Sequence, residues 1–276
     1  MKNSTLYIVA TPIGNLGDIT FRAIETLKSA DIIAAEDTRR TIKLLNHYEI
    51  KTSMMSYHQH NRKQAGEKIL SLLTAGKNVA LVTDAGMPCI SDPGYELVHD
   101  ARLQQFNVEC IPGACAAVTA MALSGFDSTY FVFEGFLPKE SKFIKQRLNI
   151  LASESRPIIL YESPHRLEKT FTMLIDNFNH RKICLANEIT KLHEKIIIDT
   201  ASNISDLLKN TPPRGEYVII IDKSANDKKE DWQNVDIKTH IKSYIDSGMS
   251  KMDAIKAVAK DRNIPKSEAY SYSIDL

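Results

Sequence analysis

The sequence predicts an α/β fold, because short apolar runs typical of buried strands alternate with segments of helical periodicity. The candidate strands are rich in valine and isoleucine and occupy residues 6–10, 31–36, 78–83, 107–112, 156–162, 182–189 and 216–222. Between them, the apolar residues of 20–30 and 67–76 recur at intervals of three and four, as on one face of a helix. We therefore expect much parallel strand pairing.

The composition is that of an ordinary globular protein. Its 276 residues are enough for two domains, each with its own core. Lysine and arginine total 35 against 34 for aspartate and glutamate, so a surface that binds a polyanion would have to be a local patch. The apolar run before Pro12 is too short for a signal peptide, and no apolar stretch approaches the length of a membrane span. We expect a cytoplasmic protein.

The cysteines show neither the CxxC spacing nor the nearby histidines of a structural zinc site. Their positions also give no disulfide framework. We expect four buried thiols, at Cys89, Cys110, Cys115 and Cys184.

Breaks in the pattern predict the domain organisation. Gly, Asp and Ser interrupt the strand and helix pattern at residues 125–131. We therefore expect one α/β domain over 1–124 and a second over 125–223. Residues 224–234 are polar and charged, and predict an exposed linker. A small helical module should follow over 235–276.

The helical module has clear signals of its own. Ser250 and Asp253 form a capping box, and the helix that they begin should end near Arg262. A turn at 263–265 then precedes a short last helix. An earlier helix, within 236–248, should carry one apolar stripe, made of Ile237, Ile241, Tyr244 and Ile245. The helix–turn–helix order of this segment resembles that of small DNA- or RNA-binding modules. A packing or dimerisation element is the alternative, and the near-balanced charge does not decide between them.

Unusual loops follow four of the candidate strands. They read TPIGNLGD, TDAGMPCISDPG, PGACAA and ESPHR. The carboxyl ends of strands form the ligand crevice of an open α/β sheet, and glycine lets the backbone approach a ligand closely. Neither a GxGxxG fingerprint nor a GxxxxGK[ST] loop is present, so a nucleoside triphosphate or a conventional Rossmann cofactor is not indicated. Each glycine alone has an explanation as a tight turn, but together the loops predict a binding site around Gly14, Gly17, Gly86 and Gly113.

A resemblance to a known family rests on seven motifs in order: YIVATPIGNLGDIT, AAEDTR, VTDAGMPCISDPG, IPGACAA, YESPHR, EITKLHE and RGEYVI. This set resembles the ribosomal small subunit methyltransferase I family, a branch of the tetrapyrrole (corrin/porphyrin) methylase superfamily. The resemblance implies a two-domain tetrapyrrole-methylase fold, usually homodimeric, with S-adenosylmethionine in a cleft between the domains. It also implies methylation of the ribose 2′-oxygen of a cytidine in the decoding centre of 16S rRNA, within the small ribosomal subunit.

The resemblance also implies which residues bind the cofactor. Cys115 stands where the family usually has serine, and a thiol is a weaker hydrogen-bond partner than a hydroxyl, so we expect only a backbone contact there. The implied cofactor-binding residues are Pro12, Asp84, Ala85, Gly86, Met87, Ile90, Cys115, Ala116, Tyr161, Glu162 and Gly215.

Methyl transfer to a ribose oxygen needs alignment of that oxygen with the methyl group, and a group that accepts the proton of the hydroxyl. A sulfonium methyl is already activated, so the enzyme must hold it about 3 to 3.5 Å from the attacking oxygen, and no metal is required. Two clusters that follow strands offer ionisable groups: Glu36, Asp37 and Arg39, then Glu188 and Lys191. Arg39 suits a phosphate contact, and one of the other four residues would accept the ribose proton. For each of them, a helix cap or a solvated surface position is the alternative.

Two other functions stay open. A tetrapyrrole methylase that acts on a small molecule would share the fold and the cofactor. A non-catalytic ribosome-binding protein could keep the cleft without using it. The EDTRR segment, the SPHR loop and the helical module favour a large anionic substrate.

Overall fold

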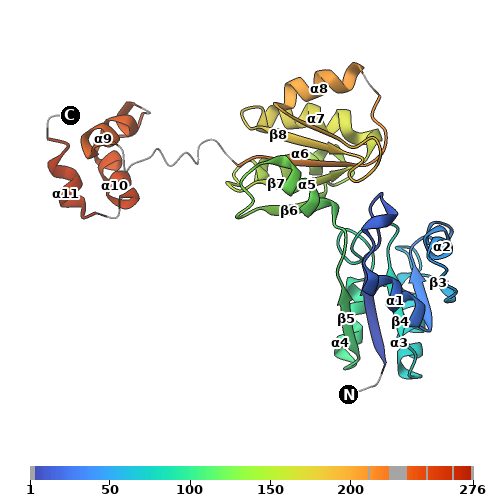
Figure 1. Ribbon diagram of the computed structural model, residues 1–276. Coiled ribbons are helices and arrows are strands. Elements are labelled where there is room, and N and C mark those ends of the chain that lie inside the picture. The colour runs from blue at the N-terminus through green and yellow to red at the C-terminus, as the bar shows by residue number, and fades with distance from the viewer. Residues whose placement is uncertain (1–3, 211, 224–234, 247, 263, 275–276) are drawn as a thin grey trace. The chain divides into compact units, whose positions relative to one another are not determined.

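The structure is a computed structural model that describes residues 4–210, 212–223, 235–246, 248–262 and 264–274. The chain divides into two compact units, residues 1–223 and 224–276. The first unit contains two five-stranded sheets (Figure 1). The predicted linker at 224–234, and Asn263 of the predicted turn, lie outside the described residues. The domain boundaries drawn from the sequence therefore stay predictions.

The first sheet is wholly parallel, in the order β3-β2-β4-β1-β5. Its strands are β1 (Thr5–Val9), β2 (Ile32–Ala35), β3 (Met54–Ser56), β4 (Val79–Val82) and β5 (Asn107–Ile111). Parallel strands that are covered on both faces are largely apolar, which is why the sequence indicates β1, β2 and β4. The sequence also indicates β5, although Asn107 and Glu109 of this edge strand are exposed. Strand β3 has three residues, too few for any periodicity, and was not predicted.

Helices cover both faces of this sheet. Helices α1 (Phe21–Ser29) and α2 (Thr38–His47) pack on one face, where Leu27 and Leu45 meet Ile33 of β2. Helices α3 (Arg62–Thr74) and α4 (Tyr95–Leu103) pack on the other face. A short 3-10 turn, η1 (Leu16–Asp18), precedes α1. The helices expected at 20–30 and 67–76 are confirmed, although the second begins earlier than predicted.

The second sheet is mixed, in the order β6-β7-β10-β8-β9. Only β6 and β7 pair in parallel. The other neighbours are antiparallel, so the expectation of parallel pairing is wrong for most of this sheet. For the β8–β9 pair alone the reason is local, because these two strands are joined by a connection too short for a parallel crossover. Its strands are β6 (Val132–Phe136), β7 (Ile158–Glu162), β8 (Ile183–Asn187), β9 (Lys195–Asp199) and β10 (Tyr217–Ile221).

This sheet is also buried on both faces. Helices α6 (Ser141–Leu151), α7 (Pro164–Phe178) and α8 (Ala201–Asn210) cover one face. Helix α5 (Ala116–Ser124) covers the other, with Ala120 and Met121 in one cluster with Ile159 and Val218. Helix α5 follows the last strand of the first sheet but packs on the second. The loop before it therefore passes from one sheet to the other.

The second unit is a three-helix module made of α9 (Ile237–Asp246), α10 (Lys251–Asp261) and α11 (Lys266–Ser271). The predicted capping box is confirmed, since the Ser250 hydroxyl accepts from the Asp253 N–H at 3.2 Å and donates to its carboxylate at 2.8 Å. The predicted apolar stripe is also confirmed: Ile241 is buried in the core of the module with α10 residues, and Ile237, Tyr244 and Ile245 pack against it.

The cysteines differ from the expectation of four buried thiols at three positions. All four are free, and Cys184 is buried as predicted, while Cys89 and Cys115 are half-buried. Cys110 is exposed, because β5 is an edge strand of the first sheet. Among the described helices, none is long and apolar enough to cross a membrane.

Candidate functional site

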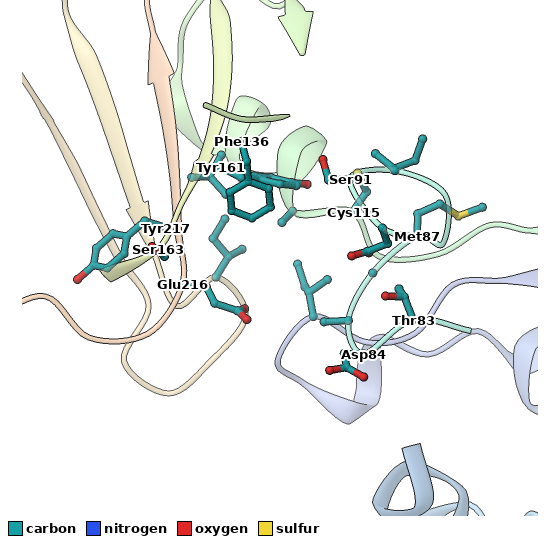
Figure 2. Close-up of a pocket in the computed structure, with 18 of the residues that line it drawn as sticks. Thr83, Asp84, Met87, Ser91, Cys115, Phe136, Tyr161, Ser163, Glu216 and Tyr217 are labelled. Carbon is teal, nitrogen blue, oxygen red and sulfur yellow. The ribbon is translucent and has the colours of Figure 1, made fainter. Parts of the chain in front are cut away.

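A cavity of about 440 Å³ in the first unit is lined by residues from both sheets (Figure 2). It lies where the loops after β1, β2, β4 and β5 meet the ends of β6, β7 and β8. The start of β10 reaches the same edge because this strand runs antiparallel to β7 and β8. The cavity therefore lies at the strand ends where the sequence predicts a ligand site, with the addition of one strand start, and ligand binding there stays a prediction.

Most of the residues predicted for the site line this cavity. They are Glu36, Asp84, Ala85, Gly86, Met87, Ile90, Cys115, Ala116, Tyr161, Glu162, Glu188 and Lys191. Pro12, Asp37, Arg39 and Gly215 do not line it, although Pro12 and Gly215 each precede a lining residue. The roles assigned to all of these residues stay predictions.

The glycines of the loops approach protein rather than open space. Gly86 has φ +86° and exchanges two backbone hydrogen bonds with Thr11, at 2.9 and 3.0 Å. A Cβ on Gly14 would lie 2.9 Å from the Thr190 hydroxyl, and one on Gly113 would lie 2.9 Å from the Cβ of Ala10. Backbone conformation and close packing of loops thus account for glycine at these three positions, and close approach to a ligand stays a prediction.

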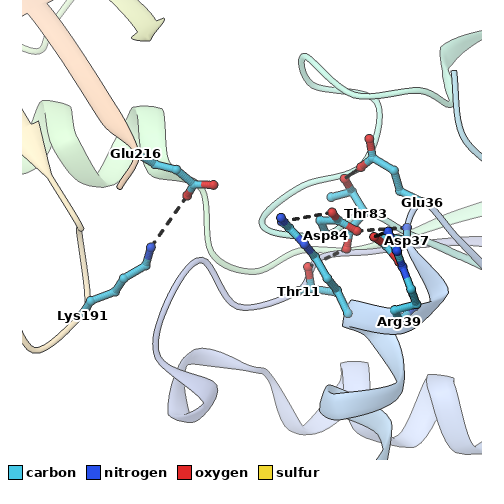
Figure 3. Close-up of polar contacts among 9 residues, drawn as sticks. Thr11, Glu36, Asp37, Arg39, Thr83, Asp84, Lys191 and Glu216 are labelled. Atoms are coloured by element: carbon cyan, nitrogen blue, oxygen red, sulfur yellow. Dashed lines mark hydrogen bonds and ion pairs between the residues drawn. The ribbon is translucent and has the colours of Figure 1, made fainter. Parts of the chain in front are cut away.

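Carboxylates gather on the first-sheet side of the cavity. The Thr83 hydroxyl donates to Glu36 at 2.6 Å, and the Asp37 N–H donates to Asp84 at 3.0 Å (Figure 3). Burial, together with the negative charge of Glu36, raises the pKa of Asp84 above its ordinary value. Within the described residues, no group of three or more His, Cys, Asp or Glu side chains is arranged to hold a metal ion.

Asp37 acts as the N-cap of α2. Its carboxylate accepts from the Arg39 N–H at 2.9 Å and from the Arg39 guanidinium at 2.7 Å (Figure 3). These hydrogen bonds lower the pKa of Asp37 to about 2. Asp37 is therefore a weak proton acceptor, and the helix-cap alternative describes its contacts.

Glu188 and Lys191 form a pair on the second-sheet side. The Lys191 ammonium donates to Glu188 at 2.8 Å. It also lies 3.9 Å from Glu216 (Figure 3). Burial raises the pKa of Glu188, but hydrogen bonds from Lys191 and from the Glu216 N–H outweigh it and lower that pKa overall. Glu188 and Thr190 have φ +51° and +67°, a conformation that costs energy in residues other than glycine and is frequent at functional loops.

The ESPHR loop is held by internal contacts. Glu162 is buried and accepts from the Ser163 N–H at 2.9 Å and from the Thr170 hydroxyl at 2.7 Å. Arg166 lies 3.3 Å from Glu162 and donates to the carbonyls of Leu137 and Pro138. The carboxylate and the guanidinium thus fix the start of α7 against the end of β6.

Tyr161 connects this loop to α5. Its hydroxyl accepts from the Ala117 N–H at 3.1 Å. Its ring contacts Phe133 and Phe136 edge to face, and Figure 2 shows Phe136 beside it. Burial raises the pKa of Tyr161 to about 12. An aromatic wall therefore stands beside the half-buried Cys115 at the start of α5.

Several lining residues were not predicted. Glu216 stands inside the RGEYVI motif and Asp92 inside the second glycine loop, so the motifs contain them but their types gave no reason to single them out. Phe136 ends β6, a strand that the sequence did not reveal. The unpredicted lining residues are Ile13, Arg40, Thr83, Ser91, Asp92, Phe136, Ser163, Pro164, Ile189, Glu216, Tyr217 and Val218.

Comparisons with known proteins agree with this geometry. Residues 5–205 match the family model of Tetrapyrrole (Corrin/Porphyrin) Methylases. The chain is 45% identical to "Ribosomal RNA small subunit methyltransferase I" of Bacillus subtilis over 96% of this chain and 92% of that protein. It is 44% identical to the protein of the same name of Thermotoga maritima, over 78% of this chain and 97% of that protein.

A solved structure has the same fold. The uroporphyrin-III C-methyltransferase of Thermus thermophilus, in complex with S-adenosyl homocysteine, has a TM-score of 0.56 and 15% identity, over 79% of this chain and 97% of its own. The similarity of sequence over nearly the whole chain, together with the two-sheet fold, settles the family. This chain belongs to the ribosomal RNA small subunit methyltransferase I family of the tetrapyrrole methylases.

Proposed function

We propose that the protein transfers a methyl group from S-adenosylmethionine to the ribose 2′-oxygen of a cytidine in the decoding centre of 16S rRNA. The observation that carries the proposal is the 45% identity, over 96% of this chain, to a protein named as a small-subunit rRNA methyltransferase. The choice of the 2′-oxygen and of cytidine rests on the resemblance of the seven motifs.

The cavity suits the cofactor in size and in chemistry. Its volume of about 440 Å³ lies in the usual range for sites that enclose small ligands. Met87, Phe136 and Tyr161 offer apolar and aromatic surface for the adenosine, and the carboxylates of Glu36 and Asp84 offer negative charge for the sulfonium and the ammonium. When bound, the cofactor supplies an activated methyl group. The residues that we assign to its binding are Asp84, Ala85, Gly86, Met87, Ile90, Cys115, Ala116, Tyr161 and Glu162.

The surface beside the cavity suits a polyanion. The Arg39 side chain is 89% exposed, and Arg40 lines the cavity 3.2 Å from Asp84. Guanidinium groups bind phosphate with two parallel hydrogen bonds, so these adjacent arginines are suited to RNA. A small-ribosomal-subunit substrate is consistent with a protein of the cytoplasm.

We extend the proposal to a homodimer. Helix α5 is apolar nearly throughout, yet Val118 and Leu123 are 56% and 42% exposed on it. Exposed apolar side chains on one element favour an interface, and a second copy of the chain is the partner that the family resemblance implies.

The test is transfer of radiolabelled methyl from S-adenosylmethionine, with small ribosomal subunits, naked 16S rRNA and tetrapyrrole precursors offered separately. Label in the RNA, mapped to a cytidine ribose by nuclease digestion and mass spectrometry, supports the proposal. Label in a tetrapyrrole identifies a small-molecule methylase instead. Binding to subunits without label in any acceptor identifies a non-catalytic ribosome-binding protein.

A further inference from the structure

The cavity contains a carboxylate that the motifs did not single out. Asp92 is half-buried in the loop between β4 and α4 and lines the cavity. Cys89, Ser91 and Gly94 of this loop all have positive φ, at 71°, 64° and 141°. A side chain at Gly94 would collide with the Cys89 thiol and with Leu81, so the loop turns tightly against the sheet. The strained backbone therefore fixes the position of Asp92.

The loop also contacts the second sheet. A Cβ on Gly135 of β6 would lie 3.0 Å from the Ser91 hydroxyl, so residue 91 approaches the bulge in that strand. The charged groups that act on Asp92 come from both sides of the cavity: Glu36 and Asp84 from the first sheet, and Glu216 from the second. Asp92 thus lies between the two halves of the site, where a substrate that enters the cavity would meet it.

Three other carboxylates of the cavity have cationic partners. Asp84 is paired with Arg40 at 3.2 Å, and Glu188 with Lys191 at 2.8 Å. Glu162 has three partners, as described above. Glu36 accepts the short hydrogen bond from Thr83. Among the described residues, no lysine, arginine or histidine forms an ion pair with Asp92. Its carboxylate therefore keeps more of its capacity to take up a proton.

The charges and the burial around Asp92 also favour proton uptake by its carboxylate. Burial raises the pKa of Asp92 to about 6, and the negative charges of Glu36, Asp84 and Glu216 act in the same direction, while hydrogen bonding with Thr83 opposes them. Cys89 and Tyr161 are the other titratable neighbours, and both have a raised pKa and are neutral at pH 7. A general base works best when its pKa is close to the operating pH, so Asp92 is better matched than Asp37.

We propose that the Asp92 carboxylate is the group that accepts the proton of the ribose 2′-hydroxyl, an inference that rests on the proposed function. The oxygen–hydrogen bond breaks and its proton moves to Asp92 as the oxygen forms its bond to the methyl carbon. The methyl–sulfur bond breaks, and its electron pair stays on sulfur, which becomes a neutral thioether. Asp92 then releases the proton to solvent. The role that the sequence assigned to Glu36, Asp37, Glu188 or Lys191 passes to a fifth residue.

The first test compares Asp92→Asn with wild type in single-turnover methylation of small subunits, with cofactor affinity measured by calorimetry. We expect the rate to fall by about 100-fold or more, with cofactor affinity changed by less than about threefold. Asp100→Asn, on the exposed part of α4, is the matched control and should keep both values. An unchanged rate overturns the inference. A loss of affinity in proportion to the loss of rate also overturns it, because Asp92 would then be a charge partner of the cofactor.

The second test needs no turnover. Carbon-13 NMR of the ligand-free protein, labelled at aspartate, should give a carboxyl pKa near 6 that disappears in Asp92→Asn. Glu36→Gln removes a negative charge and should lower this pKa, and the acid limb of this variant's pH–rate profile should shift from the wild-type position by the same amount. If the acid limb of the pH–rate profile does not shift together with the carboxyl pKa measured by NMR, Asp92 is not the acceptor. Wild-type protein that methylates no acceptor refutes the proposed function itself, whereas an active Asp92→Asn variant refutes this inference alone.

Discussion

Arg40 and Asp84 form an ion pair, with 3.2 Å between guanidinium and carboxylate, that connects α2 to the loop after β4. The neighbouring Arg39 turns instead to Asp37 and remains 89% exposed (Figure 3). Two consecutive arginines of one motif therefore have different environments. Arg40 belongs to the cavity, while Arg39 stands at the surface beside it.

Replacing Arg39 should weaken RNA binding without affecting the cofactor. Arg39→Ala removes one cation that is suited to a phosphate contact, so the slope of log K against log salt concentration should become shallower by about one unit. Filter binding of small subunits at several salt concentrations measures this slope, and calorimetry measures cofactor affinity. Arg102→Ala, an exposed arginine on α4, is the control. An equal loss in both variants would mean that only net charge matters.

Replacing Gly86 should destabilise the fold as well as weaken ligand binding. Gly86→Val places a β-branched residue at φ +86°, at a cost of about 2 kcal/mol, and its Cβ would lie 3.3 Å from Ile13. Urea unfolding should therefore give a lower free energy of unfolding. Asn tolerates left-handed backbone better, so Gly86→Asn should lose less. If both variants keep the wild-type stability, the positive φ is not the reason for glycine.

Asp92→Asn should stabilise the protein at neutral pH. The pKa of Asp92 is raised in the folded state to about 6 from an ordinary 3.8, so folding favours the protonated form. The contribution of this group is most favourable below about pH 4 and is lost as the pH rises through 6. At pH 7.5 the variant should be more stable by about 1 to 3 kcal/mol, and at pH 4 the two proteins should be equal. Urea unfolding at the two pH values measures this difference. A constant difference would show that the effect is not titration.

Deletion of residues 235–276 should leave cofactor affinity intact, because the cavity is lined entirely by residues of the first unit. We expect methylation of small subunits to fall if the three-helix module contacts RNA. The Thermotoga maritima relative aligns over 97% of its own length but only 78% of this chain, so it has no room for an equivalent module of this size. Full activity of the truncated protein would show that the module is dispensable here also.

The local pattern of the sequence was enough for most of the first sheet and for the helical module. Continuous apolar runs predicted β1, β2 and β4 because strands covered on both faces need no polar residues. The Ser250 cap was predictable because its hydrogen bonds join residues three apart. The motif order also identified half of the residues that line the cavity, since loops at the ends of strands contain them.

Only the tertiary structure decided the directions of the strands in the second sheet and the environment of each carboxylate. A strand has the same apolar pattern whichever way its neighbour runs, so β7, β8 and β10 gave no sign of antiparallel pairing. Asp37 and Asp92 are the same residue type, yet the pKa of Asp37 is lowered to about 2 by Arg39 two positions away, while that of Asp92 is raised to about 6 by burial and by carboxylates distant in sequence. Burial and long-range charge arise only when the chain has folded, which is why the sequence pointed to Asp37 and passed over Asp92.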